Sequence, residues 1–327
     1  MSLLLITWLI QLTKCSAVGK SQFLLTLLLS VQLSRISGAS KSALYISTEG
    51  PLQTVRLAQI LENHPKIVEL PAAQRPSMSR VQSTHTNDVD AQEHILRYQV
   101  PVAIKQQNIG LLIIDSIAAN YRAEFDRNKE RKAAESFAKR NNQLAELGAL
   151  LRGIARTHNI AVVVANQVAD RFTPAEITLQ PPIYSQGTQQ SRRDSLPDMP
   201  STRTMPTLHG MSEATQLASQ SLSTDEPLAL DHQQRFFTGW GDDPTATDFK
   251  TPSLGLTWTN QLSTRIALLK QPVFVQRAYQ PGEEREIAGW DRSVKLVFSP
   301  WCGESLSRFE IWQGGIRTLG ESDGSAD

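Results

Sequence analysis

Residues Gly19 to Gln22 (Gly-Lys-Ser-Gln) form a short polar segment whose residue types suit the binding of phosphate groups. The segment lies between two apolar stretches, Leu3 to Leu12 and Phe23 to Leu33, and the order strand, loop, helix is typical of a phosphate-binding loop. In such a loop, backbone N–H groups at the helix N-terminus bind phosphate oxygens. Lys20 would reach the β- and γ-phosphates, and the Ser21 hydroxyl would be a ligand of Mg²⁺. We therefore expect a nucleotide and its magnesium ion to bind here.

Two loop positions depart from the usual phosphate-loop pattern. The pattern G-x-x-x-x-G-K-[ST] has a glycine where this chain has Lys14, and an interior position that is often glycine is Ala17. A Gly-Lys-Ser triplet also recurs by chance, and the alternative is that it is only the polar start of a helix. The residues alone allow both interpretations.

Asp115 follows the run Leu111 to Ile114, which is apolar at every position. A continuous apolar run, in contrast to an alternating one, predicts a parallel strand that is covered on both faces. Open α/β sheets bind their ligands beyond the carboxyl ends of such strands. An acid at that point would hold the magnesium ion on the phosphates. The alternative is that Asp115 ends a buried strand as a turn or helix N-cap residue.

Two more polar side chains follow apolar segments. Glu49 comes shortly after the run 43–47, and Gly50 beside it favours a sharp turn. A glutamate at the carboxyl end of a strand could polarise an attacking water, although a solvated turn residue is the alternative. Gln167 follows the apolar run 160–165, where an amide could sense the γ-phosphate or, more simply, act as a cap.

The elements that would position these side chains alternate between helical and extended patterns. We expect helices at four segments, 23–33, 53–63, 91–107 and 134–158. We expect strands at seven segments, 3–12, 43–47, 66–70, 111–114, 160–165, 293–299 and 308–316, with a polar, turn-rich region at 71–90. This pattern predicts an α/β fold with a mostly parallel central sheet flanked by helices and closed by antiparallel C-terminal strands.

Composition limits the class of protein and its domain organisation. The chain of 327 residues is long enough for one sizeable core with a small second domain or a long insertion. A formal net charge of +1 excludes neither nucleic acid nor acidic partners. Cys15 and Cys302 are the only cysteines, so the chain is no disulfide scaffold and a reducing compartment is the default.

The polar composition changes sharply in the second half of the chain. Residues 172–235 are rich in Ser, Thr, Gln, Pro, Asp and Arg and lack apolar periodicity, which predicts a largely disordered insertion. Structure resumes with the segments 254–258 and 264–269. We therefore expect a core at 15–171, the C-terminal part of that core at 236–319, and a loose acidic tail at 320–327.

The N-terminal segment 1–14 has two alternative interpretations. Its apolar run is too short to span a bilayer. A secretory signal would have a positively charged residue before the apolar run, and this segment has none there. We prefer a buried strand that leads into a loop, with a signal peptide as the minority alternative.

Four segments in one order carry a family resemblance: Gly-Lys-Ser-Gln at 19–22, Tyr-Ile-Ser-Thr-Glu-Gly at 45–50, Leu-Leu-Ile-Ile-Asp-Ser at 111–116 and Val-Val-Ala-Asn-Gln-Val at 163–168. This set resembles the ATPase core of RecA-type recombinases. Segments 115–125 and 252–258, with Thr264 and Arg265 soon after, are similar to the eukaryotic recombinase paralogues. The resemblance covers most of residues 15–171 and 250–317. It also implies an N-terminally truncated core, in which residues 1–14 are either an atypical N-terminal strand or a foreign start.

The resemblance implies a RecA-like P-loop ATPase core and a role for each matched residue. It places ATP on the phosphate loop, formed by Ser16, Ala17, Val18, Gly19, Lys20, Ser21 and Gln22. Ser21 and Asp115 would bind Mg²⁺, and Arg56 would stack on adenine. Glu49 would activate water, while Gln167 would report the γ-phosphate state to a DNA-binding loop after Val168.

By the same resemblance we expect an ATP-binding mediator of homologous recombination in the nucleus, with weak DNA-dependent ATPase activity. Its partners would be single-stranded DNA, a recombinase and a recombinase paralogue, and no membrane. A second hypothesis is a non-catalytic interaction subunit that keeps the fold but has lost nucleotide binding through Lys14. A third, a secreted or membrane-anchored protein, depends only on the apolar N-terminal run.

Overall fold

The computed structural model describes residues 9–14, 18–34, 38–127, 133–170, 250–252, 254–277 and 285–319. All of them belong to one compact unit. The expected insertion at 172–235 and the expected tail at 320–327 lie outside the described residues.

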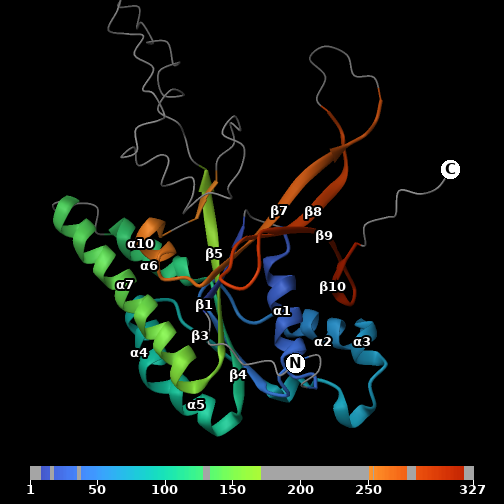
Figure 1. Cartoon of the computed structure of the whole chain (residues 1–327), viewed down its shortest axis with the longest axis horizontal. Helices are drawn as coiled ribbons and strands as arrows, with labels where there is room; N and C mark the ends of the chain where they lie inside the picture. Colours follow the sequence, from blue (N-terminus) through green and yellow to red (C-terminus); the bar gives the residue numbers. More distant parts are fainter. Residues whose placement is uncertain are drawn as a thin grey trace, which may run out of the picture. The chain divides into compact units, whose positions relative to one another are not determined.

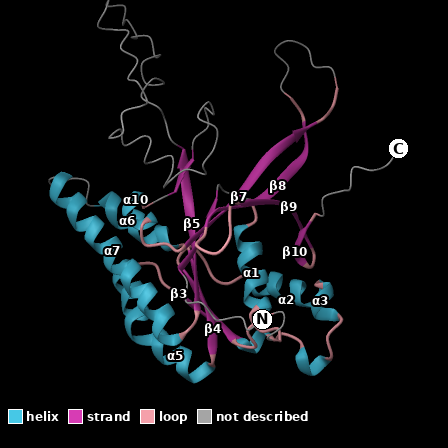
Figure 2. Ribbon diagram, in the orientation of Figure 1, coloured by secondary structure: helices cyan, strands magenta, loops and turns pink. Residues whose placement is uncertain are grey.

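A ten-stranded sheet is the centre of the described structure (Figure 2). Its strands, in chain order, are β1 (Leu9–Lys14), β2 (Ser42–Ser47), β3 (Val81–His85), β4 (Ile109–Asp115), β5 (Ala161–Asp170), β6 (Lys250–Pro252), β7 (Thr264–Phe274), β8 (Ile287–Phe298), β9 (Ser305–Trp312) and β10 (Gly315–Thr318). In space the order is β10-β9-β8-β7-β1-β5-β4-β2-β3, and β6 pairs with β5.

The strands from β3 to β7 in this order run parallel, whereas β8, β9 and β10 run antiparallel. The expected α/β class, with a mostly parallel sheet and antiparallel C-terminal strands, is therefore confirmed. All seven residues of β4 are buried, which agrees with its continuous apolar sequence. Residues 9–14, the end of the N-terminal segment, form β1 between β5 and β7.

Helices cover both faces of the sheet (Figure 1). On one face lie α1 (Lys20–Ser30), α2 (Thr54–Asn63) and α3 (Pro65–Val68). On the other face lie α4 (Val89–His94), the π-helical turn η3 (Ile95–Gln99), α5 (Val100–Gln107), α6 (Ile117–Arg127), α7 (Ala133–His158) and α10 (Gly255–Thr259). Two 3₁₀ turns, η1 (Ala72–Gln74) and η2 (Met78–Arg80), precede β3. Two apolar cores, one on each face, result from this arrangement. Among the described helices, none combines the length and the apolar character needed to cross a membrane.

The strand expected at 66–70 is wrong, because residues 66–68 belong to the short helix α3 and residues 69–70 to the turn after it. Pro65 occupies the first turn of α3, where its fixed φ favours a helix and its missing N–H costs nothing. Ile67 is the buried residue of this helix. A run of five residues is too short for periodicity to separate helix from strand.

Two further differences concern strands. The region 71–90, expected to be turn-rich, contains β3, which pairs with β2 at the edge of the sheet. An edge strand accepts polar side chains on its exposed positions, so its sequence lacks an apolar run. The strand expected at 308–316 is divided into β9 and β10, because the chain turns at residues 313–314. Gly315, with φ +102°, begins β10 in a conformation that favours glycine.

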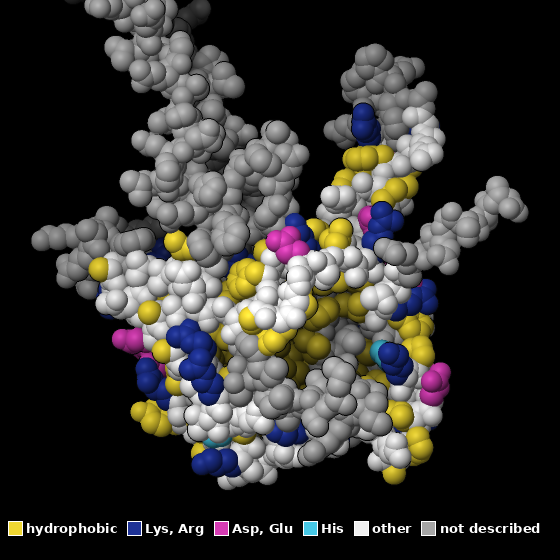
Figure 3. Space-filling view, in the orientation of Figure 1, with side chains coloured by type: hydrophobic (Ala, Val, Ile, Leu, Met, Phe, Trp, Pro, Cys, Tyr) yellow, Lys and Arg dark blue, Asp and Glu magenta, His cyan; other side chains and the backbone are white. Residues whose placement is uncertain are grey.

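Beyond the sheet, β7 and β8 continue as a two-stranded ribbon (Figure 1). β1 pairs with β7 only at 264–268, and β9 pairs with β8 only at 293–296. The farther part of the ribbon carries exposed apolar side chains, Val273, Phe274, Ile287 and Trp290. Figure 3 shows hydrophobic side chains along this ribbon. The Lys270 Nζ lies 3.5 Å from the centroid of the Trp290 ring, so a cation–π contact lies on this apolar surface.

A buried polar contact joins α10 to β1. Trp258 and Gln11 are both 0% exposed, and the Trp258 indole N–H donates a hydrogen bond to the Gln11 side-chain oxygen. A buried acceptor that loses its donor costs the free energy of its desolvation. This contact therefore fixes α10 against the strand that leads into the phosphate loop.

Trp258→Phe is expected to lower the free energy of unfolding by about 1–3 kcal/mol, because the Gln11 oxygen then lacks its indole donor. Urea denaturation followed by far-UV circular dichroism measures this change. Trp290→Phe is the matched control, since Trp290 is 44% exposed and its replacement is expected to cost less than about 0.5 kcal/mol. Equal unfolding midpoints for wild type and Trp258→Phe would contradict the structural role of this contact.

Candidate nucleotide-binding site

The parallel strands bring the predicted site residues to one edge of the sheet. In the register of the sheet, Ser47 at the end of β2 lies beside Asp115 at the end of β4. Lys14 at the end of β1 lies beside Gln167 in β5. Because the carboxyl ends of parallel strands share an edge, side chains from four strands and the following loops converge there.

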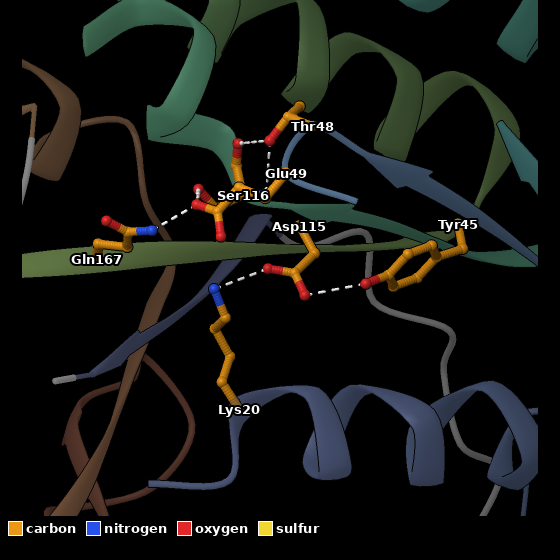
Figure 4. A network of polar contacts seen from close by, with 7 residues as sticks. All are labelled: Lys20, Tyr45, Thr48, Glu49, Asp115, Ser116 and Gln167. Atoms are coloured by element: carbon orange, nitrogen blue, oxygen red, sulfur yellow. Dashed lines mark hydrogen bonds and ion pairs between the residues drawn. The ribbon is translucent and has the colours of Figure 1, made fainter. Parts of the chain in front are cut away.

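Asp115 is the centre of one group of contacts at this edge (Figure 4). The Lys20 Nζ lies 2.8 Å from Asp115 Oδ1, and the Tyr45 hydroxyl donates a 2.9 Å hydrogen bond to Asp115 Oδ2. Lys20 is 6% exposed and Asp115 is 8% exposed, so the ion pair is buried. Among the described residues, each carboxylate oxygen of Asp115 therefore has one partner.

Tyr45 keeps its proton in this environment. Burial, together with the negative charge of Asp115, raises the pKa of the Tyr45 hydroxyl well above its usual value. The hydroxyl therefore donates to Asp115 throughout the physiological pH range.

A second group of contacts lies beside the first and centres on Glu49 (Figure 4). The Ser116 hydroxyl donates a 3.0 Å hydrogen bond to Glu49 Oε1, and the Gln167 amide donates to the same oxygen. Thr48 accepts a hydrogen bond from the Ser116 backbone N–H and donates one to the Ser116 carbonyl, which joins the loops after β2 and β4. Glu49 is exposed, so its carboxylate is accessible to water.

The described part of the predicted phosphate loop has backbone features that suit the binding of an anion. Gly19 precedes α1 with φ +119°, a conformation that favours glycine, and a Cβ there would lie 2.6 Å from Ile311 Cδ1. No side chain caps the N-terminus of α1, so its N–H groups are not satisfied by a capping residue. Ser16 and Ala17 lie outside the described residues, and so does the side chain of Lys14.

The residues present fit a nucleotide with Mg²⁺. A helix N-terminus with a following lysine suits phosphate oxygens. Mg²⁺ prefers a few protein oxygens together with phosphate oxygens and water, and Ser21, in the first turn of α1, and Asp115 carry such oxygens. The described residues contain no group of three His, Cys, Asp or Glu side chains that would form an independent metal centre.

Arg56 in α2 connects three elements next to this site. Its guanidinium donates to the side-chain oxygens of Gln22 in α1 and Gln59 in α2, and to the carbonyl oxygens of Trp312 and Gln313. These donors lie in the plane of the guanidinium, so the hydrogen bonds leave its faces for stacking. The burial of Arg56 lowers its pKa, but an arginine remains charged at neutral pH.

The structure thus brings together Lys20 with Asp115, and Glu49 with Gln167. Arg56 donates a hydrogen bond to Gln22, which lies in the first turn of α1. Sequence reasoning missed the contacts made by three other residues, Tyr45, Thr48 and Ser116. A hydroxyl side chain directly after an apolar strand is a signal for Thr48 and Ser116. Tyr45 gives no comparable signal, because an aromatic residue is common in a buried strand.

Comparison with known proteins finds one matching family and several relatives that are named as DNA repair proteins. Residues 11–184, more than half of the chain, match the Rad51 family. The chain is 37% identical to DNA repair protein rhp57 of Schizosaccharomyces pombe over 264 residues, which are 78% of this chain and 61% of that protein. It is 28% identical to DNA repair protein RAD57 of Saccharomyces cerevisiae over 351 residues, 93% of this chain and 72% of that protein. It is 30% identical to DNA repair protein XRCC3 of Bos taurus over 309 residues, 93% of this chain and 67% of that protein. The chain thus spans less than two thirds of the length of the S. pombe protein.

Proposed function

The chain belongs to the Rad51 family, and on this basis we propose that it is an ATP-binding DNA repair protein that acts as a mediator of homologous recombination. It would assist the assembly of a recombinase on single-stranded DNA. The observation that carries this proposal is the buried Lys20–Asp115 pair at the N-terminus of α1, beside the Glu49–Gln167 contact. Relatives that are all named as DNA repair proteins support the biological role.

ATP binding would use the residues described above in distinct ways. Lys20 would turn from Asp115 to the β- and γ-phosphates, and Ser21 and Asp115 would hold Mg²⁺. The ion would neutralise charge on the phosphate oxygens. The face of the Arg56 guanidinium would stack on adenine, since its edges are occupied by hydrogen bonds.

Glu49 and Gln167 support a role for ATP as a switch. Glu49 would orient a water toward the γ-phosphate. Gln167 would respond to the nucleotide through Glu49, because its amide donates a hydrogen bond to Glu49 Oε1. β5 continues from Gln167 to Asp170, at the border of the described residues. We expect slow, DNA-dependent hydrolysis, with assembly on single-stranded DNA controlled by nucleotide binding.

The partners and the location follow from the same proposal. The chain would act in the nucleus with the recombinase and with a recombinase paralogue in a hetero-oligomer. A second candidate function is a non-catalytic interaction subunit. The exposed apolar side chains of the β7–β8 ribbon, among them Phe274 and Trp290, favour it, because exposed apolar patches and aromatic side chains are typical of protein interfaces.

A filament-assembly assay tests this proposed function. Labelled single-stranded DNA, covered with a single-strand-binding protein, is mixed with the recombinase and its paralogue, with or without this chain. With ATP and Mg²⁺, wild type is expected to accelerate the fluorescence change of filament formation, and Lys20→Ala is expected not to. Acceleration by Lys20→Ala that equals the acceleration by wild type would support the interaction subunit. No acceleration in any condition would contradict both functions.

A further inference from the structure

Tyr45 is a buried polar residue whose hydroxyl has a single described partner, Asp115. It lies in β2, where the neighbouring residues Leu44 and Ile46 are apolar and buried. A phenylalanine would fill the same place in the core without the need to satisfy a hydroxyl group. What the hydroxyl adds to this packing is its hydrogen bond to Asp115.

The two oxygens of Asp115 have different partners, and only one of these partners can leave. Oδ1 faces the Lys20 ammonium, which belongs to a long, flexible side chain at the start of α1. Oδ2 accepts a hydrogen bond from Tyr45, which is 7% exposed and belongs to the apolar core between the sheet and α1 and α2. Figure 4 shows Lys20 and Tyr45 on either side of the carboxylate.

The carboxylate of an aspartate has a broad torsional preference about its last bond and needs a partner to fix its orientation. When Lys20 turns to a phosphate, Oδ1 becomes free. If Oδ2 remained free as well, the carboxylate could rotate. The Tyr45 hydroxyl prevents this rotation because it donates a 2.9 Å hydrogen bond to Oδ2 from a buried position in β2.

We propose that Tyr45 is a positioning residue for Mg²⁺: it holds one oxygen of Asp115 so that the oxygen released by Lys20 faces the metal ion. The inference rests on the proposed ATP site and adds to it a residue that does not contact nucleotide or metal. Partners of metal ligands that act in this way commonly change metal affinity when they are removed.

Tyr45→Phe tests the inference by separating the affinity for Mg²⁺ from the affinity for nucleotide. Binding of a fluorescent ATP analogue to the full chain is measured first in EDTA and then as Mg²⁺ is added. In EDTA, the variant is expected to bind the analogue as wild type does. The Mg²⁺ concentration at the midpoint of the magnesium-dependent change is expected to rise roughly 10- to 100-fold. Saturating Mg²⁺ is expected to restore binding to the wild-type level.

Tyr98→Phe is the matched control, because it makes the same chemical change at a residue that is 64% exposed and outside the site. Its Mg²⁺ midpoint is expected to equal that of wild type. An equal midpoint for Tyr45→Phe would overturn the inference and leave the proposed ATP site intact. Equal losses of affinity with and without Mg²⁺ would also overturn it, since they indicate a general structural effect. No binding by wild type would instead overturn the proposed ATP site, and the inference with it.

Discussion

Lys20→Ala is expected to lower the affinity for ATP with Mg²⁺ by roughly 100-fold and also to destabilise the nucleotide-free protein. Both effects have one cause. The Lys20 ammonium would pair with phosphate in the bound state, and it pairs with Asp115 at 2.8 Å in the structure. Its removal leaves a carboxylate that is 8% exposed without its cation. Breaking a buried pair in this way costs about 3 kcal/mol of unfolding free energy.

Urea denaturation without nucleotide measures the expected loss of stability in Lys20→Ala. The double variant Lys20→Ala/Asp115→Ala is the control. The double variant removes the buried charge together with its partner, so it is expected to recover part of the lost stability. Isothermal titration calorimetry with ATP and Mg²⁺ measures the expected loss of nucleotide affinity. An unchanged urea midpoint for Lys20→Ala would show that the pair contributes no stability, and unchanged affinity would exclude Lys20 from the nucleotide site.

Asp115→Asn is expected to raise the affinity for ATP in EDTA and to remove the dependence of that affinity on Mg²⁺. Without the metal, the neutral asparagine no longer holds the Lys20 ammonium, so phosphate competes with a weaker partner. The affinity for ATP in EDTA is therefore expected to rise roughly tenfold, which corresponds to about 1.4 kcal/mol. With the metal, the loss of a carboxylate ligand is expected to abolish the gain in affinity that Mg²⁺ gives to wild type.

The two conditions are measured on the same preparation with a fluorescent ATP analogue, first in EDTA and then in excess Mg²⁺. Glu49→Gln is the control, because it removes a neighbouring carboxylate that does not contact Lys20 in the described structure. It is expected to leave the affinity in EDTA less changed than Asp115→Asn does. A fall in metal-free affinity for Asp115→Asn would contradict the view that Asp115 competes with phosphate for Lys20.

The centre of the fold was predictable from the sequence because its signals are local and strong. The apolar run before Asp115 predicts a buried parallel strand, and β4 is buried at every residue. Polar side chains after several such strands predict one shared edge, where the structure places Lys20 beside Asp115 and Glu49 beside Gln167. Their roles toward ATP and Mg²⁺ stay predictions.

The parts that sequence reasoning missed depend on contacts between distant segments or on very short elements. Tyr45 contacts Asp115 across 70 positions of the chain, and Arg56 contacts the turn after β9 across more than 250 positions. No local pattern marks such pairs. The helix α3 and the edge strand β3 have only four and five residues, so propensity and periodicity give little information about them.

The most direct test of the central claim is the equilibrium binding of a fluorescent ATP analogue to the wild-type chain, with Mg²⁺ and with EDTA, beside Lys20→Ala. We expect saturable binding by wild type that is tighter with Mg²⁺ and roughly 100-fold weaker in Lys20→Ala. Such a result would show that the departures at Lys14 and Ala17 are compatible with a working phosphate loop. Absent binding, or equal binding by both chains, would contradict the account and favour the interaction subunit.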